Sequence, residues 1–415
     1  MTLENIKLDI DYVRSQFPAF KDPLSKDWSF FENAGGSYVP QNVIDNLTDF
    51  MISTKVQPYG EYPMAKIAGE NMDKATLLFA EMINAKNREI IIGGSTSINL
   101  YVLSNALKKY INSGDEIIVT NQDHEANISP WRRLSEYGAK IVEWQFNLNN
   151  HELEISTLKE LITSKTKILA VTHCSNIVGS VNNLKEITKI AHENDIIVIG
   201  DGVSYAPHGF PNVKELDIDF YTFSLYKTYG PHLALLYGKE EILKDLPNQN
   251  HEFLIGKYPY TINPGGPNHE ELVSLIGIYE YFNNLYIHHF ENENLNVLQK
   301  IQKVNNLISA HEEKLANPIL KYIDERKDLN LIGKNKINNK NRAPTISFTS
   351  KNISSKELCM KLIKNKIATK NDNFYAWRCL QALNIDPDDG VIRISLTHYN
   401  TINEVSNLIS VLEKI

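Results

Sequence analysis

Cysteine is scarce in this chain. Its 415 residues include only three, Cys174, Cys359 and Cys379, and these lie far apart. Their spacing matches neither a metal-binding motif nor a disulfide framework, so a zinc-stabilised module and a small disulfide-rich secreted domain are both excluded. We therefore expect no metal site, and a reducing cytoplasm is the simplest compartment for three free thiols.

Long apolar runs and an excess of positive charge are also missing. No uninterrupted apolar run approaches the ~20 residues that a membrane-spanning helix needs. Residues 1–5 contain no basic stretch leading into an apolar region, so no signal peptide is expected. The formal net charge of −7 argues against nucleic acid or a membrane surface as a partner. A hydrophobic content of 42% is instead typical of a globular protein with a sizeable core.

Short apolar, β-branched runs recur through the first two thirds of the chain, several of them separated by helix-like segments such as 97–110 and 183–193. The predicted strands are 89–92, 116–120, 140–144, 167–172, 196–200, 220–223 and 233–237. Strands that alternate with helices predict an α/β fold with a mostly parallel seven-stranded sheet covered by helices on both faces. In such sheets ligands bind beyond the carboxyl ends of the strands.

The remainder of the chain predicts a smaller α+β unit. One long helix is expected over 292–315, followed by a solvated Asn/Lys-rich loop over 334–342. The other predicted elements are strands at 345–349 and 391–396, helices at 354–364 and 403–414, and an N-terminal helix at 9–16 that packs with this unit. Two domains follow: a large one over 21–285, and a small one made of 1–20 and 286–415.

Lys227 and Asp201 are the first candidates for a functional pair. Lys227 comes just after the predicted strand 220–223, and Asp201 directly follows the strand 196–200. An acid and a lysine at the ends of two parallel strands can converge on one ligand. A cofactor with a pyridine ring and an aldehyde needs that pair, because the amine forms a Schiff base and the carboxylate keeps the ring nitrogen protonated. The alternative is that Lys227 is a solvated loop lysine.

Hydroxyl groups near strand ends suit a phosphate site. Ser95 and Thr96 follow two glycines at the start of a predicted helix, where free backbone N–H groups bind anions. Ser224 and Tyr226 flank Lys227 and are close enough in sequence to reach the same phosphate. A helix N-cap with a glycine turn would explain Ser95 and Thr96 equally well.

Three further side chains complete the constellation, each with a structural alternative. His124 is placed to stack on a planar ring, or is an ordinary loop residue. Asn176 is placed to hydrogen-bond a phenolic oxygen of the cofactor, or caps a turn. Arg393 lies inside an apolar strand and needs an anionic partner, which is either a substrate carboxylate or an internal salt bridge.

Together these residues resemble the class V aminotransferase family of fold-type-I pyridoxal-phosphate enzymes, in particular its cysteine desulfurase-like members. The resemblance covers nearly the whole chain. The segments that carry it are 17–18, 32–37, 124–131, 172–179, 201–202, 224–231 and 393–401.

The resemblance implies a role for each candidate. Lys227 would hold pyridoxal 5′-phosphate, Asp201 would pair with its ring nitrogen, His124 would stack on the ring and Asn176 would meet the ring oxygen. The other cofactor-binding residues would be Ser95, Thr96, Ser204, Ser224 and Tyr226. Arg393 would bind the α-carboxylate of an amino-acid substrate, with Asn33, Gly35 and Tyr375 nearby. Members of the family act as homodimers with shared active sites, so Gly266 would reach the phosphate of the partner subunit.

Departures from the desulfurase pattern bear on the reaction. Tyr226 stands where desulfurases often have histidine, and Ser204 where they often have glutamine. Tyr375 occupies the position of the mobile cysteine that forms a persulfide. Cys379 lies four residues later in a predicted helix at 375–383, and we expect it to be packed and inert, like Cys174.

The expected function is therefore that of an enzyme acting on an amino acid through an external aldimine and an α-carbanion. A C–S lyase that works by β-elimination without a persulfide cysteine is the first hypothesis. An epimerase or an aminotransferase is the alternative among enzymes. A non-catalytic scaffold is a third reading, which the presence of Lys227, Asp201, His124 and Arg393 opposes.

Overall fold

A seven-stranded sheet forms the centre of the molecule in a computed structural model, which describes residues 6–291, 294–338 and 340–415. Its strands are β2 (Ile90–Gly93), β3 (Glu116–Thr120), β4 (Lys140–Trp144), β5 (Thr166–Thr172), β6 (Ile197–Asp201), β7 (Phe220–Ser224) and β8 (Ala234–Gly238). The spatial order is β2-β8-β7-β6-β5-β3-β4. β8 runs antiparallel to both of its neighbours, β2 and β7, and the remaining pairs of this sheet are parallel. The predicted mostly parallel seven-stranded sheet is thus confirmed, with strand bounds that differ by at most one residue.

Alternating side chains of the strands feed two separate cores. Ile117 and Val119 of β3 pack with α4 (Thr96–Leu107) on one face, whereas Ile118 points into the core of the other face. The second face is covered by helices that include α3 (Pro63–Met82), α7 (Leu184–His192) and α11 (Ile276–His289). Burial on both faces explains why these strands read as continuous apolar runs in the sequence.

Shorter helices complete the covering of the sheet and its loops. They are α2 (Gln41–Ser53), α5 (Ser129–Arg132), α6 (Ile155–Leu161), α8 (Val213–Leu216), α9 (Glu240–Asp245) and α10 (His269–Ser274).

The C-terminal part forms a second, smaller sheet. β9 (Leu329–Ile332), β10 (Thr345–Ser350), β12 (Lys370–Asp372) and β13 (Val391–Ser395) pair in the antiparallel order β12-β13-β10-β9. Its helices are α13 (Ser355–Lys364), α14 (Trp377–Ala382) and α15 (Ile402–Glu413), and β1 (Ser29–Phe30) pairs with β11 (Ile367–Ala368) at its side. The predicted strands and helices of this unit are present. The domain boundaries at 20/21 and 285/286 stay a prediction.

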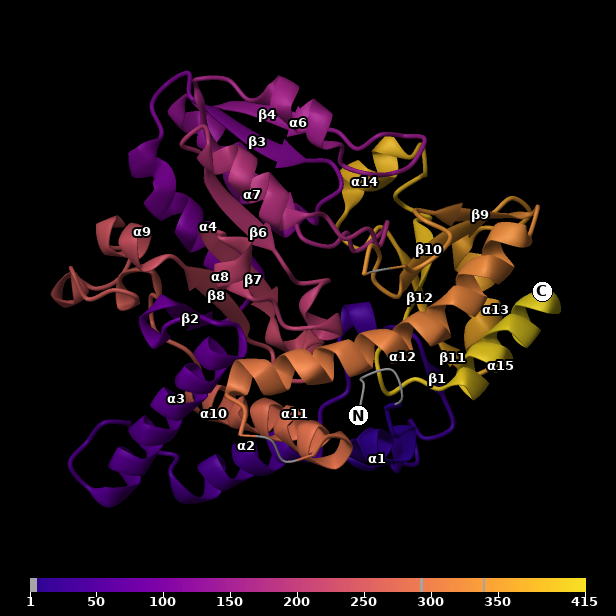
Figure 1. Ribbon diagram of the computed structural model, residues 1–415, viewed down its shortest axis with the longest axis horizontal. Coiled ribbons are helices and arrows are strands. Elements are labelled where there is room, and N and C mark those ends of the chain that lie inside the picture. Colours follow the sequence, from indigo (N-terminus) through magenta and orange to yellow (C-terminus); the bar gives the residue numbers. More distant parts are fainter. Residues whose placement is uncertain (1–5, 292–293, 339) are drawn as a thin grey trace.

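The long helix that joins the two parts differs from its prediction. Helix α12 spans Val297–Glu325 and crosses the molecule from α11 to β9 (Figure 1), whereas residues 292–315 were expected. Asn292 lies outside the described residues. The helix continues past Leu315 because Ile319, Leu320 and Ile323 extend its buried face, even though Pro318 lies inside it. Burial of that apolar stripe outweighs the lost hydrogen bond of one proline.

Helix α1 (Ile10–Ser15) contacts both parts of the molecule. The Arg14 guanidinium lies 3.1 Å from the Glu404 carboxylate at the start of α15. The backbone N–H of Asp9 donates to His289 of α11 at 2.8 Å. The expected packing on the C-terminal unit is therefore confirmed, with an additional contact to the helices beside the large sheet.

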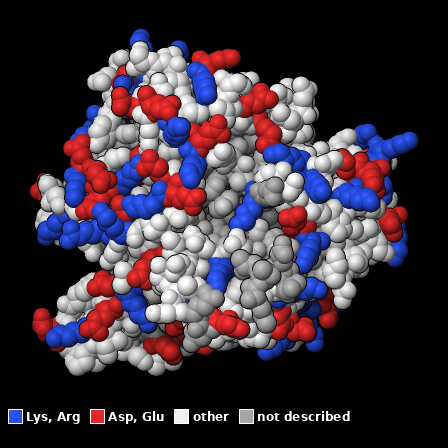
Figure 2. Space-filling view, in the orientation of Figure 1, with Lys and Arg blue, Asp and Glu red and all other residues white. Residues whose placement is uncertain are grey.

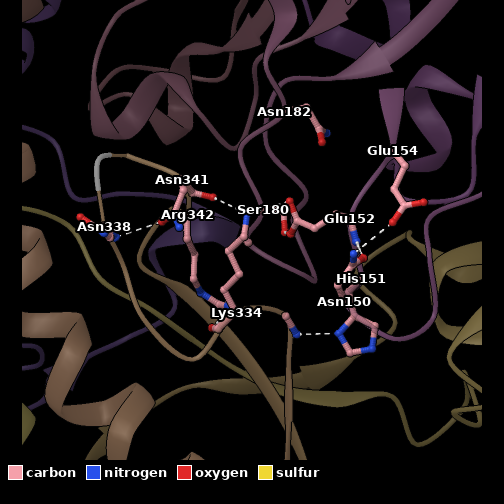
Figure 3. Close-up of polar contacts among 12 residues, drawn as sticks. Asn150, His151, Glu152, Glu154, Ser180, Asn182, Lys334, Asn338, Asn341 and Arg342 are labelled. Atoms are coloured by element: carbon pink, nitrogen blue, oxygen red, sulfur yellow. Dashed lines mark hydrogen bonds and ion pairs between the residues drawn. The ribbon is translucent and has the colours of Figure 1, made fainter. Parts of the chain in front are cut away.

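A polar seam also joins the two parts, behind the turn that carries Asn176. Glu152 accepts from Lys334 at 2.7 Å and from the Ser180 hydroxyl (Figure 3). His151 accepts the backbone N–H of Gly333 at 3.0 Å (Figure 3). These contacts tie the loop after β4 and the loop after β5 to the segment after β9.

The distribution of surface charge and the hydropathy of the helices both agree with the composition of the sequence. Acidic and basic side chains are interspersed on the face that Figure 2 shows, without a large patch of one sign. Among residues 6–291, 294–338 and 340–415, none of the helices is long and apolar enough to cross a membrane.

Candidate active site

A cavity of about 610 Å³ lies at the carboxyl ends of the central strands, where the small sheet approaches them. Most of the predicted site residues line it: Gly35, Ser95, Thr96, His124, Asn176, Asp201, Ser204, Ser224, Tyr226, Lys227, Tyr375 and Arg393. The wall also contains residues that sequence reasoning missed: Glu32, His232, Lys370, Asp372 and Phe374. Sequence reasoning gave none of these five a role, although Glu32 lies in the segment 32–37 that carries the family resemblance. They come from short loops and strand ends that only the tertiary fold brings together.

Lys227 is buried at the floor of this cavity. All residues of β7 are buried, and the strand leads into a single 3₁₀ turn, Leu225–Lys227, that turns the lysine inward. Only 8% of Lys227 is exposed, so the alternative of a solvated loop lysine is wrong. Burial, together with the nearby charge of Arg393, lowers the pKa of the Lys227 ammonium to about 8.

Asp201 closes the neighbouring strand β6 and is buried beside the same cavity. Its Oδ1 accepts the backbone N–H of Val203 at 2.8 Å, which fixes the carboxylate. Burial raises the pKa of the Asp201 carboxyl, while Lys227 acts in the opposite direction. A second buried acid, Asp123, has its pKa raised by burial and by the charge of Asp201. A cationic partner in the cavity would relieve this accumulation of negative charge.

Hydroxyl groups gather at one end of the cavity. Ser95 caps α4 by accepting the backbone N–H of Ile98 at 3.2 Å, so the capping alternative holds for this residue. The Thr96 and Ser224 hydroxyls lie 2.9 Å apart, and both residues also line the cavity. The Tyr226 ring stacks on His232 with centroids 4.8 Å apart. Hydroxyls at a helix N-terminus are suited to an anion such as a phosphate.

His124 lies over another part of the cavity as a neutral imidazole. Its Nδ1 accepts the backbone N–H of Ala126 at 3.0 Å, which fixes the ring orientation. Burial, followed by the charges of Lys227 and Arg393, lowers the pKa of His124 to about 3. The ring is therefore uncharged at neutral pH, which suits stacking on a flat, electron-poor ligand.

Arg393 and Asn176 line the cavity and contact each other. The Arg393 guanidinium is buried, lies 3.6 Å from the Phe374 ring centroid and donates weakly to the Asn176 carbonyl at 3.4 Å. Glu32 is 3.6 Å from the same guanidinium, so the alternative of an internal ion pair is present. Within the described residues, however, Arg393 Nε and Asn176 Oδ1 are buried without a hydrogen-bond partner. Unpartnered buried polar atoms of this kind indicate a missing ligand or water.

The loop before α14 forms a fixed wall at the mouth of the cavity. Phe374 and Tyr375 both have left-handed backbone conformations, with φ of +49° and +57°. The Phe374 carbonyl accepts from Asn176 at 2.9 Å, and the Tyr375 carbonyl accepts the backbone N–H of Glu125 at 2.8 Å. The Tyr375 side chain is 70% exposed, and its ring lies 5.4 Å from that of His124.

All three cysteines are buried free thiols. Cys379 lies in α14, which begins at Trp377 rather than at the expected residue 375 because the left-handed residues before it cannot belong to a right-handed helix. Burial raises the pKa of the Cys379 thiol to about 12 and that of Cys174, which lines the cavity, also to about 12. A thiol with so high a pKa is a poor nucleophile at neutral pH.

Two predicted residues lie outside this cavity. Asn33 donates to the Ser395 carbonyl at 2.7 Å and accepts from the Tyr399 hydroxyl, so its amide is used in attaching the N-terminal segment to β13. The expectation that Asn33 lies near the substrate stays a prediction. Gly266 is exposed, has a positive φ of +68° and lies away from the cavity of its own chain.

Comparisons with known proteins agree with this site. The family model described as aminotransferase class-V matches residues 29–408. The aminotransferase-like protein FGM3 of Gibberella zeae is 35% identical, covering 100% of both chains. The cysteine desulfurase-like protein ustD of Aspergillus flavus is 30% identical over 100% of this chain and 92% of its own. A structure of the cysteine desulfurase from Thermococcus onnurineus NA1 superposes with a TM-score of 0.84 at 23% identity, covering 97% of each chain.

Proposed function

Since this chain belongs to the aminotransferase class-V family, whose members are pyridoxal-phosphate-dependent enzymes, we propose that it is a C–S lyase that eliminates a sulfur leaving group from the β-carbon of an amino acid without a persulfide cysteine. The observation that carries this proposal is that Tyr375 stands in the loop at the cavity mouth, while the thiol that lines the cavity, Cys174, is buried with a raised pKa.

The residues present fit pyridoxal 5′-phosphate. Buried Lys227 and Asp201 flank the floor, hydroxyls gather at one end, and Asn176 Oδ1 and Arg393 Nε await partners. When bound, this cofactor supplies an aldehyde that condenses with amines and a protonated ring that withdraws electrons from the substrate α-carbon. Ser95, Thr96, Ser224 and Tyr226 would hold its phosphate, with Ser204 alongside.

The side chains of this enzyme then have distinct tasks. Lys227 Nζ would hold the aldehyde of the cofactor and would serve as the base for the α-proton, because its pKa of about 8 makes its neutral form more accessible than that of an ordinary lysine. The Asp201 carboxylate would keep the proton on the ring nitrogen. His124 would cover the ring and exclude water from it, and Arg393 would orient the substrate through its α-carboxylate.

The cysteines of this chain argue against a persulfide relay. A persulfide relay needs a reactive thiolate near the substrate, whereas burial raises the pKa of both Cys174 and Cys379 to about 12. An aminotransferase or an epimerase would share Lys227, Asp201 and Arg393, so these remain the second candidates for the same site.

The test begins with the visible absorption of the purified protein. We expect a yellow protein whose absorption changes on Lys227→Ala, and a colourless protein or an unchanged spectrum would contradict the cofactor assignment. The enzyme is then incubated with a panel of amino acids, and sulfide, pyruvate and keto acids are assayed. Sulfide release that survives changing Cys174, Cys359 and Cys379 to Ala supports the lyase, whereas release abolished by Cys379→Ala alone contradicts it.

The enzyme is also proposed to work as a homodimer with shared sites, in the cytoplasm. Gly265 and Gly266 form an exposed loop with positive φ of +80° and +68°. The Gly266 N–H donates to the Asn263 carbonyl at 3.2 Å, and the loop as a whole is proposed to reach the phosphate of a second subunit. Exposed Phe253 and Ile255 lie close to it in sequence and supply apolar surface for an interface. Sedimentation analysis measures the oligomeric state.

The proposal of a cytoplasmic location rests on the cysteines. Three free thiols fit a reducing compartment.

A further inference from the structure

We propose that the natural substrate carries a second anionic group on its side chain, such as a carboxylate or a sulfinate, and that Lys370 receives it while Arg393 holds the α-carboxylate. This inference rests on the proposed function, because it deepens the assignment of the same site. It names Lys370 as a specificity-determining residue.

The geometry of two adjacent strands places the two cations together. Lys370 of β12 is directly opposite Arg393 of β13 in the antiparallel register, so the two side chains leave the sheet on the same face. Both line the cavity. The Phe374 ring has Arg393 Cζ at 3.6 Å and Lys370 Nζ at 5.8 Å from its centroid, so one aromatic side chain contacts both cations.

Like charges directly opposite each other in a sheet are destabilising unless anions compensate them. Two acids of the same cavity do so here: Asp372 lies 2.6 Å from Lys370 Nζ, and Glu32 lies 3.6 Å from Arg393. The pairs are unequal in burial. The Lys370 and Asp372 side chains are 55% and 31% exposed, whereas the Arg393 side chain is 3% exposed.

This difference separates the two recognition tasks. Arg393 keeps an unpartnered, buried Nε and a long contact to Glu32, so it has donors left for a carboxylate that every amino acid possesses. The Lys370–Asp372 pair is solvated and therefore cheap to exchange for another anion. A side-chain carboxylate or sulfinate bound near Arg393 reaches Lys370 next, whereas a neutral side chain gives that ammonium no partner better than Asp372.

Binding by the cofactor-loaded enzyme tests the proposal. Matched pairs are titrated (aspartate against asparagine, glutamate against glutamine, cysteine sulfinate against cysteine), and the change in visible absorption gives each Kd. At least one anionic member is expected to bind about tenfold more tightly than its neutral partner, in line with a charged hydrogen bond that is partly solvated. Lys370→Gln should remove this preference and leave the Kd of the neutral members within about twofold.

Two further variants sharpen the result. Asp372→Asn frees Lys370 and should strengthen binding of the anionic members. Lys361→Gln is a matched control, because Lys361 also pairs with an acid (Glu357, at 3.1 Å) but lies on α13 away from the cavity. It should leave every Kd unchanged.

Equal affinity within all three pairs, a preference that survives Lys370→Gln, or tighter binding of aromatic amino acids against Tyr375 would each overturn the inference. Failure of the proposed function is a separate outcome, since a protein whose absorption responds neither to Lys227→Ala nor to any amino acid would contradict the cofactor assignment itself.

Discussion

Burial selects the protonation states of the residues around the cavity. Lys227 and His124 both have lowered pKa values, first of all because burial penalises their charged forms. The pKa values of Asp201 and Asp123 are raised, because burial penalises their charged forms as well. The site thus combines an amine that loses its proton more readily than an ordinary lysine with carboxyls that gain from a cationic partner. A Schiff base to the aldehyde of a cofactor whose pyridine nitrogen is protonated requires this combination.

The first prediction concerns the reactivity of Lys227 in protein freed of cofactor. Only the neutral amine attacks an aldehyde, and its fraction rises with pH through the lysine pKa of about 8, compared with an ordinary value of 10.5. Covalent labelling with pyridoxal phosphate and borohydride should therefore reach half of its maximal rate near pH 8. A midpoint near the ordinary lysine value would contradict the described burial, and Lys227→Arg should show no labelling at this site.

The second prediction concerns Asp201. Asp201→Asn removes the charge that keeps the ring nitrogen protonated, so kcat should fall on the order of 10²–10³-fold, the usual effect of losing one electrostatic stabiliser. KM should change little, because the role proposed for Asp201 is toward the cofactor ring and not toward the substrate. Steady-state kinetics measure both constants. The exposed Asp195→Asn variant is the control, and a fall in kcat of less than about fivefold for Asp201→Asn would contradict the assigned role.

At the scale of helices and strands, the burial of each element decided whether the sequence could predict it. The seven central strands were predictable because both faces of that sheet are buried, so each strand is an apolar run. The residues at their ends, such as Asp201 and Lys227, followed from the rule that parallel strands share one edge. Half-exposed strand β12 and the two-residue β1 lack such a pattern, so Lys370 was missed as a cavity residue, and Glu32, just after β1, was given no role.

The end of helix α12 and the start of helix α14 were predicted wrongly, because packing and backbone conformation decide them rather than the local sequence. A proline argues against a helix, yet α12 continues through Pro318 because tertiary packing of its apolar stripe decides the outcome. The predicted start of α14 at Tyr375 is wrong because Phe374 and Tyr375 have positive φ. Such a conformation cannot be predicted from phenylalanine or tyrosine, since positive φ is typical of glycine and asparagine.

That loop gives the third prediction. Tyr375 has a φ of +57°, which costs a residue with a Cβ about 1 kcal/mol relative to glycine. Its side chain is 70% exposed, so little packing is lost on truncation. Tyr375→Gly should therefore be more stable than Tyr375→Ala by about 1 kcal/mol in denaturant unfolding. Equal stability of the two variants, or greater stability of the alanine variant, would mean that the loop relaxes to another conformation.

At the scale of the whole molecule, the polar seam of Figure 3 holds the small sheet against the large one. Glu152 is its central acceptor, since it binds both Lys334 and the buried Ser180 hydroxyl. Glu152→Ala leaves that hydroxyl unsatisfied and should lower the free energy of unfolding by about 1–3 kcal/mol.

Glu154→Ala is the matched control for this fourth prediction, because Glu154 bonds Asn147 and Asn150 within a single loop. Denaturant unfolding of both variants at neutral pH measures the difference. A loss at Glu154 equal to that at Glu152 would show that contacts across the seam contribute no more than contacts within the loop.

Residues of both sheets line the cavity, and this has a consequence for how much of the enzyme a cell contains. Lys227 and Ser224 come from the large sheet and Arg393 from the small one, so a tightly held occupant stabilises the assembled molecule over its opened forms. At a thousand times its Kd, such an occupant adds about 4 kcal/mol. Protein made under vitamin B6 starvation should therefore open more often and be degraded faster, so that nutrition controls the abundance of the enzyme as well as its activity.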